Sequence, residues 1–223
     1  MRQRGFTLIE LMVAISVMAM LAVLSWRGLD GMARAQAQTQ ARADEVLTLQ
    51  SGLAQWGADL DAVVQVPQVN AIDWDGRALR MTRRSTASPY DGLLVVAWSR
   101  RNIEGAGKWL RWQSPLLRTR GELQEAWDRA ALWAQNPGDE EVRREVVISG
   151  LDEWQIFYFR SDAWTNPLSS GATTTAIPAA VQAANVSTIP DGVRLVLTLP
   201  AGQALSGVIT RDWVRPTVGG GKS

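Results

Sequence analysis

The stretch MRQRGFTLIELMVAISVMAMLAVLSW, residues 1–26, decides the fold of this chain. Two arginines stand before an apolar run over residues 6–26 that contains a single acid, Glu10. Read as one helix, this run is about 30 Å long at ~1.5 Å per residue, which is enough to cross the hydrocarbon core of a bilayer. The sequence therefore predicts a membrane-embedded helix at the start of the chain.

The charges around this run set its expected orientation. Arg2 and Arg4 precede the run and Arg27 follows it. Because basic residues near a membrane span tend to remain on the cytoplasmic side, the pair before the run favours a cytoplasmic N-terminus. We therefore expect a single-pass inner-membrane protein whose remaining residues lie in the periplasm.

Glu10 is out of place in an apolar helix. A carboxylate at membrane depth costs a few kcal/mol on insertion scales. The side chain could reach towards the lipid headgroups, or it could have a cationic partner inside the membrane. The second interpretation gives the acid a function.

The six residues Gly5-Phe6-Thr7-Leu8-Ile9-Glu10 resemble the class III signal of type IV pilins and of type II secretion pseudopilins. The resemblance implies that a prepilin peptidase cleaves between Gly5 and Phe6 and that the same enzyme then methylates the new amine of Phe6. It also implies that Glu10 pairs with the N-terminal amine of a neighbouring subunit during assembly, which explains the costly charge.

Two other kinds of N-terminus compete with this interpretation. An ordinary secretory signal also has a basic start and an apolar core, and A-x-A cleavage patterns occur at residues 33–35 and 35–37. Those patterns lie well past Trp26, and the apolar core is longer than the usual 7 to 15 residues. A plain signal anchor would need neither Gly5 nor Glu10.

The overall composition excludes several classes of function. The chain has 223 residues, a formal net charge of +1, no cysteine and no histidine. Without cysteine there is no disulfide, in contrast to the C-terminal loop that many type IV pilins close, and this favours a pseudopilin. Without histidine, the common hydrolytic triads and the commonest zinc ligand are missing. We expect no enzymatic activity, no cofactor, no metal and no nucleic-acid partner, and we interpret most of the eleven tryptophans as core or interface anchors.

These observations predict the domain organisation. We expect a leader at 1–5, a transmembrane assembly helix at 6–26 and its periplasmic continuation at 27–64. A β-rich globular domain follows at 65–215, and a flexible tail at 216–223.

The continuation of the helix has two halves. Residues 32–42 are polar and alanine-rich and could form an exposed neck, whereas the later half carries apolar residues at alternating spacings of three and four. We interpret this later stripe as packing on the chain's own domain, and Pro67 marks the end of the helical region. The stripe consists of Val46, Leu49, Leu53, Trp56, Leu60 and Val63. The weak points of the helix are Gly28, Gly31, Gly52 and Gly57.

Period-two patterns and turn residues predict β-structure in the rest of the chain. We expect an α+β fold in which the long helix packs on an antiparallel sheet. The predicted strands are 78–83, 92–99, 108–113, 142–148, 153–160, 193–199 and 207–214. Residues 121–135 have a helical composition, and residues 169–189 read as a long surface loop.

Two further features resemble the J-type minor pseudopilins of type II secretion. One is Trp26-Arg27-Gly28-Leu29-Asp30, directly after the membrane anchor. The other is the order of elements that follows. It comprises the 92–96 strand, a tryptophan-rich hairpin, 149–151 leading into 154–158, and then 189–193.

The resemblance implies a structural subunit of the pseudopilus tip that supports export of folded proteins. Its partners would be the I, K and H minor pseudopilins, the major pseudopilin and the prepilin peptidase/methyltransferase. A minor pilin of a type IV pilus is the alternative within the same class. A signal-anchored periplasmic enzyme or binding module is the alternative outside it.

Two acidic stretches are further candidate sites. Asp73-Trp74-Asp75-Gly76 has the alternating acids of a calcium loop but lacks the distal glutamate, so a β-turn is the better interpretation. Residues 139–141 are acidic and are interpreted as a solvated turn.

Overall fold

The computed structural model describes residues 7–85, 92–169 and 189–216. The chain divides into two compact units, Met1–Asp44 and Glu45–Ser223. Gly5 and Phe6 lie outside the described residues, as do the rest of the predicted leader and nearly all of the predicted 169–189 loop and C-terminal tail.

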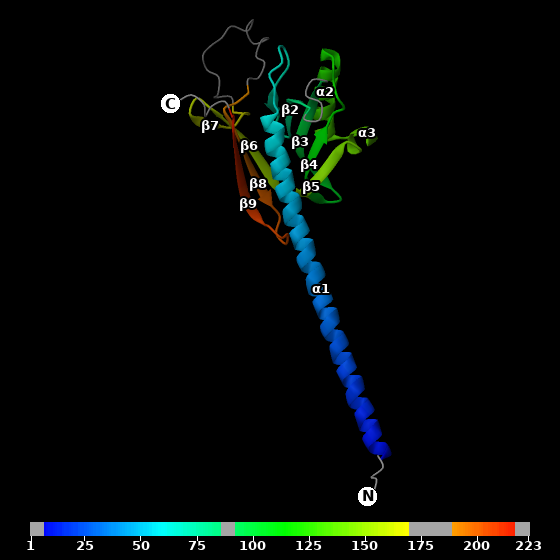
Figure 1. The fold of residues 1–223 in the computed structure, drawn as a ribbon. Coiled ribbons are helices and arrows are strands. Elements are labelled where there is room, and N and C mark those ends of the chain that lie inside the picture. The colour runs from blue at the N-terminus through cyan, green and yellow to red at the C-terminus, as the bar shows by residue number, and fades with distance from the viewer. Residues whose placement is uncertain (1–6, 86–91, 170–188, 217–223) are drawn as a thin grey trace. The chain divides into compact units, whose positions relative to one another are not determined.

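The predicted long helix is confirmed as α1 (Leu8–Asp61), which belongs to both units (Figure 1). It ends at Asp61 rather than near residue 64. The reason is that the next residues hydrogen-bond along a strand instead of continuing the helix. The Val64 amide donates to the Thr82 carbonyl and the Arg84 amide to the Ala62 carbonyl, both at 3.0 Å.

In the first unit, polar side chains of α1 find partners one turn away on the same helix. Ser16 Oγ donates to the Met12 carbonyl at 2.9 Å, and Thr39 Oγ1 donates to the Ala35 carbonyl at 2.9 Å. Arg34 pairs with Asp30. These polar side chains are therefore satisfied within the helix itself, which matters most for Ser16 in the apolar run.

The described residues of the second unit form two antiparallel sheets, where the sequence predicted one (Figure 1). The first sheet follows the chain order β1 (Ile72–Trp74), β2 (Ala78–Arg84), β3 (Leu93–Ile103), β4 (Ala106–Gln113) and β5 (Glu145–Gly150). The second has the order β7 (Ala163–Thr165), β6 (Glu153–Arg160), β8 (Gly192–Leu199) and β9 (Gly207–Val214). The division falls at Leu151-Asp152, where Leu151 is buried and the Asp152 amide bonds to Thr198 of β8.

The predicted strands are present, with shifts at their ends, and two short strands were missed. β1 takes in Asp73 and Trp74 of the predicted turn, and β7 also has only three residues, too few to show a period. The acidic stretch predicted as a turn opens the short exposed helix α3 (Asp139–Val142), so β5 begins at Glu145 and not at residue 142.

The two faces of β6 differ in burial. Ile156 and Tyr158 are buried, whereas Phe157 and Phe159 on the other face are partly exposed. Burial raises the pKa of the Tyr158 phenol above its usual range, as expected for a side chain on the inner face of a sheet. The period-two pattern of this strand therefore reports a real inner and outer face.

The predicted second helix is confirmed as α2 (Arg120–Gln135). Thr119 caps its start, and the Glu122 side chain returns to the Thr119 backbone in a reciprocal capping box. Hydrogen bonds from the amides of Arg118 and Thr119 hold the pKa of the Glu122 carboxyl below its usual range.

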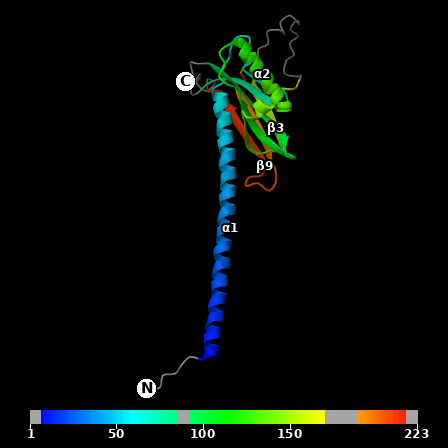
Figure 2. The same cartoon turned by 90° about the vertical axis from the view of Figure 1, so that its right-hand side faces the viewer.

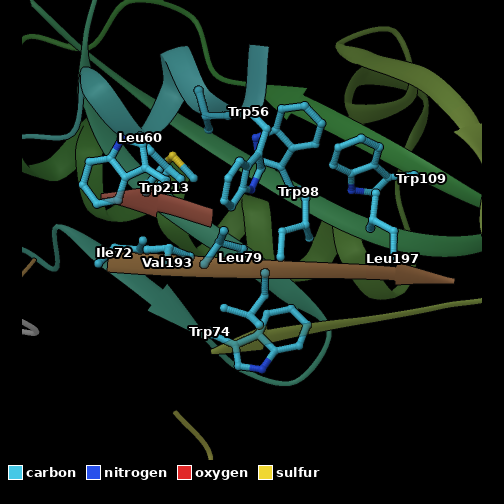
Figure 3. Packing of buried hydrophobic residues seen from close by; sticks show 14 of the residues in the cluster. Trp56, Leu60, Ile72, Trp74, Leu79, Trp98, Trp109, Val193, Leu197 and Trp213 are labelled. Atoms are coloured by element: carbon cyan, nitrogen blue, oxygen red, sulfur yellow. The ribbon is translucent and has the colours of Figure 1, made fainter. Parts of the chain in front are cut away.

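Two apolar cores lie on opposite faces of the first sheet. One lies between α1, the inner face of this sheet and the second sheet, and the indoles of Trp56, Trp98 and Trp109 are fully buried in it (Figure 3). The other lies under α2, which covers the far face (Figure 2), and contains Trp112 and Trp133. Trp109 and Trp112 are three residues apart in β4, so they point to opposite faces and serve different cores.

Gly52 lets α1 approach the first sheet closely. It is buried, and a Cβ at this position would overlap Cγ2 of Ile148 in β5 and lie 3.4 Å from the Trp109 ring. Ile148 is β-branched and cannot swing aside easily. Gly57, five positions on, is different, because a Cβ there would have no other atom within 4 Å. Only Gly52 of this pair therefore carries a steric constraint.

We predict opposite effects for the two glycine-to-alanine changes. Gly52→Ala should lower the free energy of unfolding by about 1–3 kcal/mol because the methyl group overpacks the helix–sheet contact. Gly57→Ala should raise it by up to about 1 kcal/mol through helix propensity. Denaturant titration of the full chain in detergent, followed by near-ultraviolet circular dichroism, measures both, and equal effects of the two changes would contradict the close-approach role of Gly52.

Candidate functional site

Glu10 lies in the first turn of α1 and has hydrogen bonds to Thr7. Glu10 Oε2 accepts from the Thr7 amide at 2.9 Å and from Thr7 Oγ1 at 2.8 Å, and the Glu10 amide donates to Thr7 Oγ1 at 3.4 Å. This reciprocal pair has the form of a capping box. The acid that stood out in the sequence therefore also serves the start of its own helix.

The capping box matters because of where the helix would lie. In a bilayer there is no water to satisfy the first amides of a helix, and each unsatisfied group costs several kcal/mol. Sequence reasoning assigned Glu10 to a neighbouring subunit and missed Thr7. The signal was present, because Thr-x-x-Glu occurs both at 7–10 and at the capped start of α2.

The apolar side chains on both sides of Glu10 are exposed. The large ones from Leu8 to Trp26 have between 53% and 77% of their surface accessible. Within the described residues, α1 is the one helix that is long and apolar enough to cross a membrane. This surface indicates a membrane anchor.

A second acid of α1 lies in the protein core. Asp59 is fully buried, and its Oδ2 accepts from Arg111 Nε at 2.7 Å and from Trp98 Nε1 at 2.9 Å. Its Oδ1 accepts from Arg111 Nη2 and Gln55 Nε2, each at 2.9 Å, and also from Arg83 Nη1. One carboxylate thus joins α1 to β2, β3 and β4.

Two other acids of α1 bind the second sheet. Asp61 Oδ1 accepts from Trp213 Nε1 of β9 at 2.7 Å, and Glu45 Oε2 accepts from the Ala204 amide in the β8–β9 turn at 2.9 Å. The predicted stripe is confirmed from Val46 to Leu60 as the inward face of the helix, but Val63 lies past its end, and the stripe did not include Asp59. The signal for Asp59 was its place beside Leu60 on that stripe, where an acid needs a partner.

The candidate calcium loop is engaged in protein contacts. Asp73 Oδ2 binds Arg80 Nη2 at 2.6 Å, and Asp75 Oδ2 lies 3.3 Å from the same nitrogen. Asp75 Oδ1 also accepts from the amides of Arg77 and Ala78. The turn interpretation fits Asp75 and Gly76, whereas Asp73 and Trp74 belong to β1. The described ranges contain no group of three or more potential metal ligands.

Comparison with known proteins supports the interpretation of the N-terminus. The family model of the prokaryotic N-terminal methylation motif matches residues 1–26. The chain carries a prepilin-type N-terminus. This confirms the kind of signal that the resemblance of residues 5–10 predicted, and Gly5, Phe6 and Glu10 all lie inside the matched range.

Among solved structures, the chain is similar to one described as the GspK-GspI-GspJ complex of the type 2 secretion system of enterotoxigenic Escherichia coli. The identity is 18%, the match covers 76% of this chain and 96% of that chain, and the TM-score is 0.45. A comparison with curated proteins finds no match.

We predict that Asp59→Ala destabilises the protein by about 3–5 kcal/mol, because it leaves the buried guanidinium of Arg83 and the largely buried one of Arg111 without their carboxylate. The matched control is Asp30→Ala, which breaks an exposed pair in the same helix and should cost less than about 1 kcal/mol. Thermal unfolding of both variants of the full chain in detergent checks this, and similar midpoints would refute the role given to Asp59.

Proposed function

We propose that this chain is a J-type minor pseudopilin, a structural subunit of the pseudopilus tip in a type II secretion system. The observation that carries the proposal is the methylation motif running directly into the apolar start of α1. The J-type subtype is supported by the resemblance of residues 26–30 and of the strand order to J-type minor pseudopilins. The lack of cysteine favours a pseudopilin over a type IV pilin. The proposed role is structural, without catalysis and without a cofactor.

The proposed assembly step joins two charges inside the membrane. Cleavage after Gly5 would free the amine of Phe6, and methylation would keep that amine cationic. A neighbouring Glu10 would then supply the carboxylate, and the pair would be far stronger than in water because the surroundings have a low dielectric constant. Each ion alone would carry a large desolvation cost, so pairing favours side-by-side helices.

The capping box is compatible with this pairing. Both Thr7 donors bind Oε2 of Glu10. A neighbour's amine can therefore approach Oε1 while the helix start remains capped. The same carboxylate would stabilise its own helix before assembly and hold an adjoining subunit afterwards.

The proposed location follows from the motif and from the charges before the span. The N-terminus would remain in the cytoplasm, α1 would cross the inner membrane, and the second unit would lie in the periplasm. The proposed partners are the prepilin peptidase, the I, K and H minor pseudopilins and the major pseudopilin.

Replacing Gly5 by leucine should block processing, because a bulky side chain at the cleavage position would not fit a peptidase that recognises glycine. We expect the chain to accumulate at its full length. Mass spectrometry of the N-terminus tests this. In the unaltered protein we expect a chain that begins at methylated Phe6, and a mature terminus in the Gly5→Leu variant would refute the proposed cleavage.

Replacing Glu10 by alanine should weaken assembly and leave cleavage largely intact, because the acid is needed for the intersubunit pair and not for recognition of Gly5. We expect loss of co-purification with the I and K components and reduced secretion. Ser16→Ala, in the same span, is the control, because that hydroxyl bonds to its own helix. Normal recovery of the tip complex with Glu10→Ala would contradict the intersubunit role.

A minor pilin of a type IV pilus is the second candidate, because the methylation motif is common to both systems. The phenotype of a gene deletion distinguishes a pseudopilin from a type IV minor pilin. Retention of exoproteins in the periplasm supports the pseudopilin, whereas loss of twitching with normal secretion supports the pilin.

A further inference from the structure

A polar groove of about 640 Å³ lies in the second unit. It forms where the start of β2, the end of β3 and the start of β6 meet. The side chains that supply its chemistry are Arg77, Arg100, Asn102, Asp152, Glu153, Trp154 and Gln155. Nothing in the proposed assembly of the N-terminal helix uses this groove.

The guanidinium of Arg100 is held in place on the groove wall. Arg100 Nε donates to the Leu151 carbonyl at 3.1 Å. Gly107, across the β3–β4 pair, has no side chain, and a Cβ there would lie only 2.6 Å from Arg100 Nη2 and 3.0 Å from its Cζ. The guanidinium therefore lies against the Gly107 backbone with its Nε fixed, and Arg100 is one of the residues that line the groove.

Two of the groove's arginines have no carboxylate partner among the described residues. Arg101, the neighbour of Arg100, binds both carboxylate oxygens of Glu145 at 2.7 and 2.8 Å. In contrast, within residues 7–85, 92–169 and 189–216 no ion pair joins Arg77 or Arg100 to a carboxylate. The fixed guanidinium of Arg100 and the exposed guanidinium of Arg77 can therefore donate hydrogen bonds to a bound anion.

We propose that this groove binds an extended acidic peptide segment of a partner protein, with an aspartate or glutamate carboxylate held by Arg100 and Arg77. An arginine fork matches the geometry of a carboxylate. The side-chain amides of Asn102 and Gln155 can hydrogen-bond to the peptide backbone on either side of the acidic residue. The partly exposed indole of Trp154 offers an apolar contact; it packs edge-on against Trp74 at a centroid distance of 4.7 Å.

The groove contains acids as well as arginines. Asp152 and Glu153 line the same groove, so an incoming anion meets negative charge as well as positive charge. Charge alone therefore does not decide between anions, because the attraction of the arginines and the repulsion of the acids both grow with the charge of the ligand. A peptide also contacts Asn102, Trp154 and Gln155, which inorganic phosphate is too small to reach together, so the site favours a peptide carboxylate over phosphate.

The test uses the full chain in detergent at low ionic strength and a fluorescein-labelled peptide Gly-Glu-Ser-Glu-Gly, with Gly-Gln-Ser-Gln-Gly as the uncharged control. Fluorescence anisotropy should show saturable binding of the glutamate peptide alone. Arg100→Ala should weaken that binding about tenfold, because a charge-assisted bond is lost. Arg77→Ala, an exposed change that leaves the fold intact, should weaken it about threefold, since it removes the second, less firmly held charge.

Arg143→Ala is the matched control, because Arg143 is exposed at the end of α3 and does not line the groove. It should bind the peptide as the unaltered chain does. Equal binding of the two peptides, undiminished binding by both groove variants, or tighter binding of inorganic phosphate than of the glutamate peptide would each overturn the proposal. None of these outcomes depends on cleavage after Gly5 or on Glu10. The groove proposal can therefore be wrong while the proposed function holds, and the reverse is also true.

Discussion

The carboxylate of Asp59 is the constraint on which the second unit depends. It is buried in the core and accepts hydrogen bonds from side chains of three strands and of its own helix. A buried charge is tolerated only when its partners are all in place, so this group admits one position of the helix along the sheet. Apolar residues of similar size could fill the space with comparable stability, but they would tolerate sliding of the helix. We therefore interpret the ionic cluster as fixing the register of α1.

Several other features follow once the register is fixed. Trp56 enters the core beside Trp98 and Trp109 (Figure 3), and Gly52 meets Ile148 at a distance that allows no side chain. The second sheet then closes on the same helix through a bond between Trp213 and Asp61. Both sheets thus depend on where the last three turns of α1 are placed.

The two unusual acids of α1 solve the same physical problem differently. Glu10 is exposed among apolar side chains, and Thr7 supplies it with two donors from within the same turn. Asp59 faces an apolar interior, and its donors Trp98 and Arg111 come from far along the chain. The local solution at Glu10 needs no residue outside the first turn of α1, whereas the long-range solution at Asp59 ties the helix to its own domain. This division agrees with the split of the chain at Asp44.

The sequence alone determined the kind of N-terminus, the long helix with its apolar stripe, and the order of most strands. These features depend on the identity and spacing of residues that are close in sequence, so local patterns were sufficient to predict them. Only the tertiary structure decided that the strands form two sheets, that Asp59 lies at the centre of the core and that Arg100 lines a groove. Those facts depend on pairings between distant residues, such as Asp59 with Arg111 and Arg100 with Leu151, and no local period encodes them.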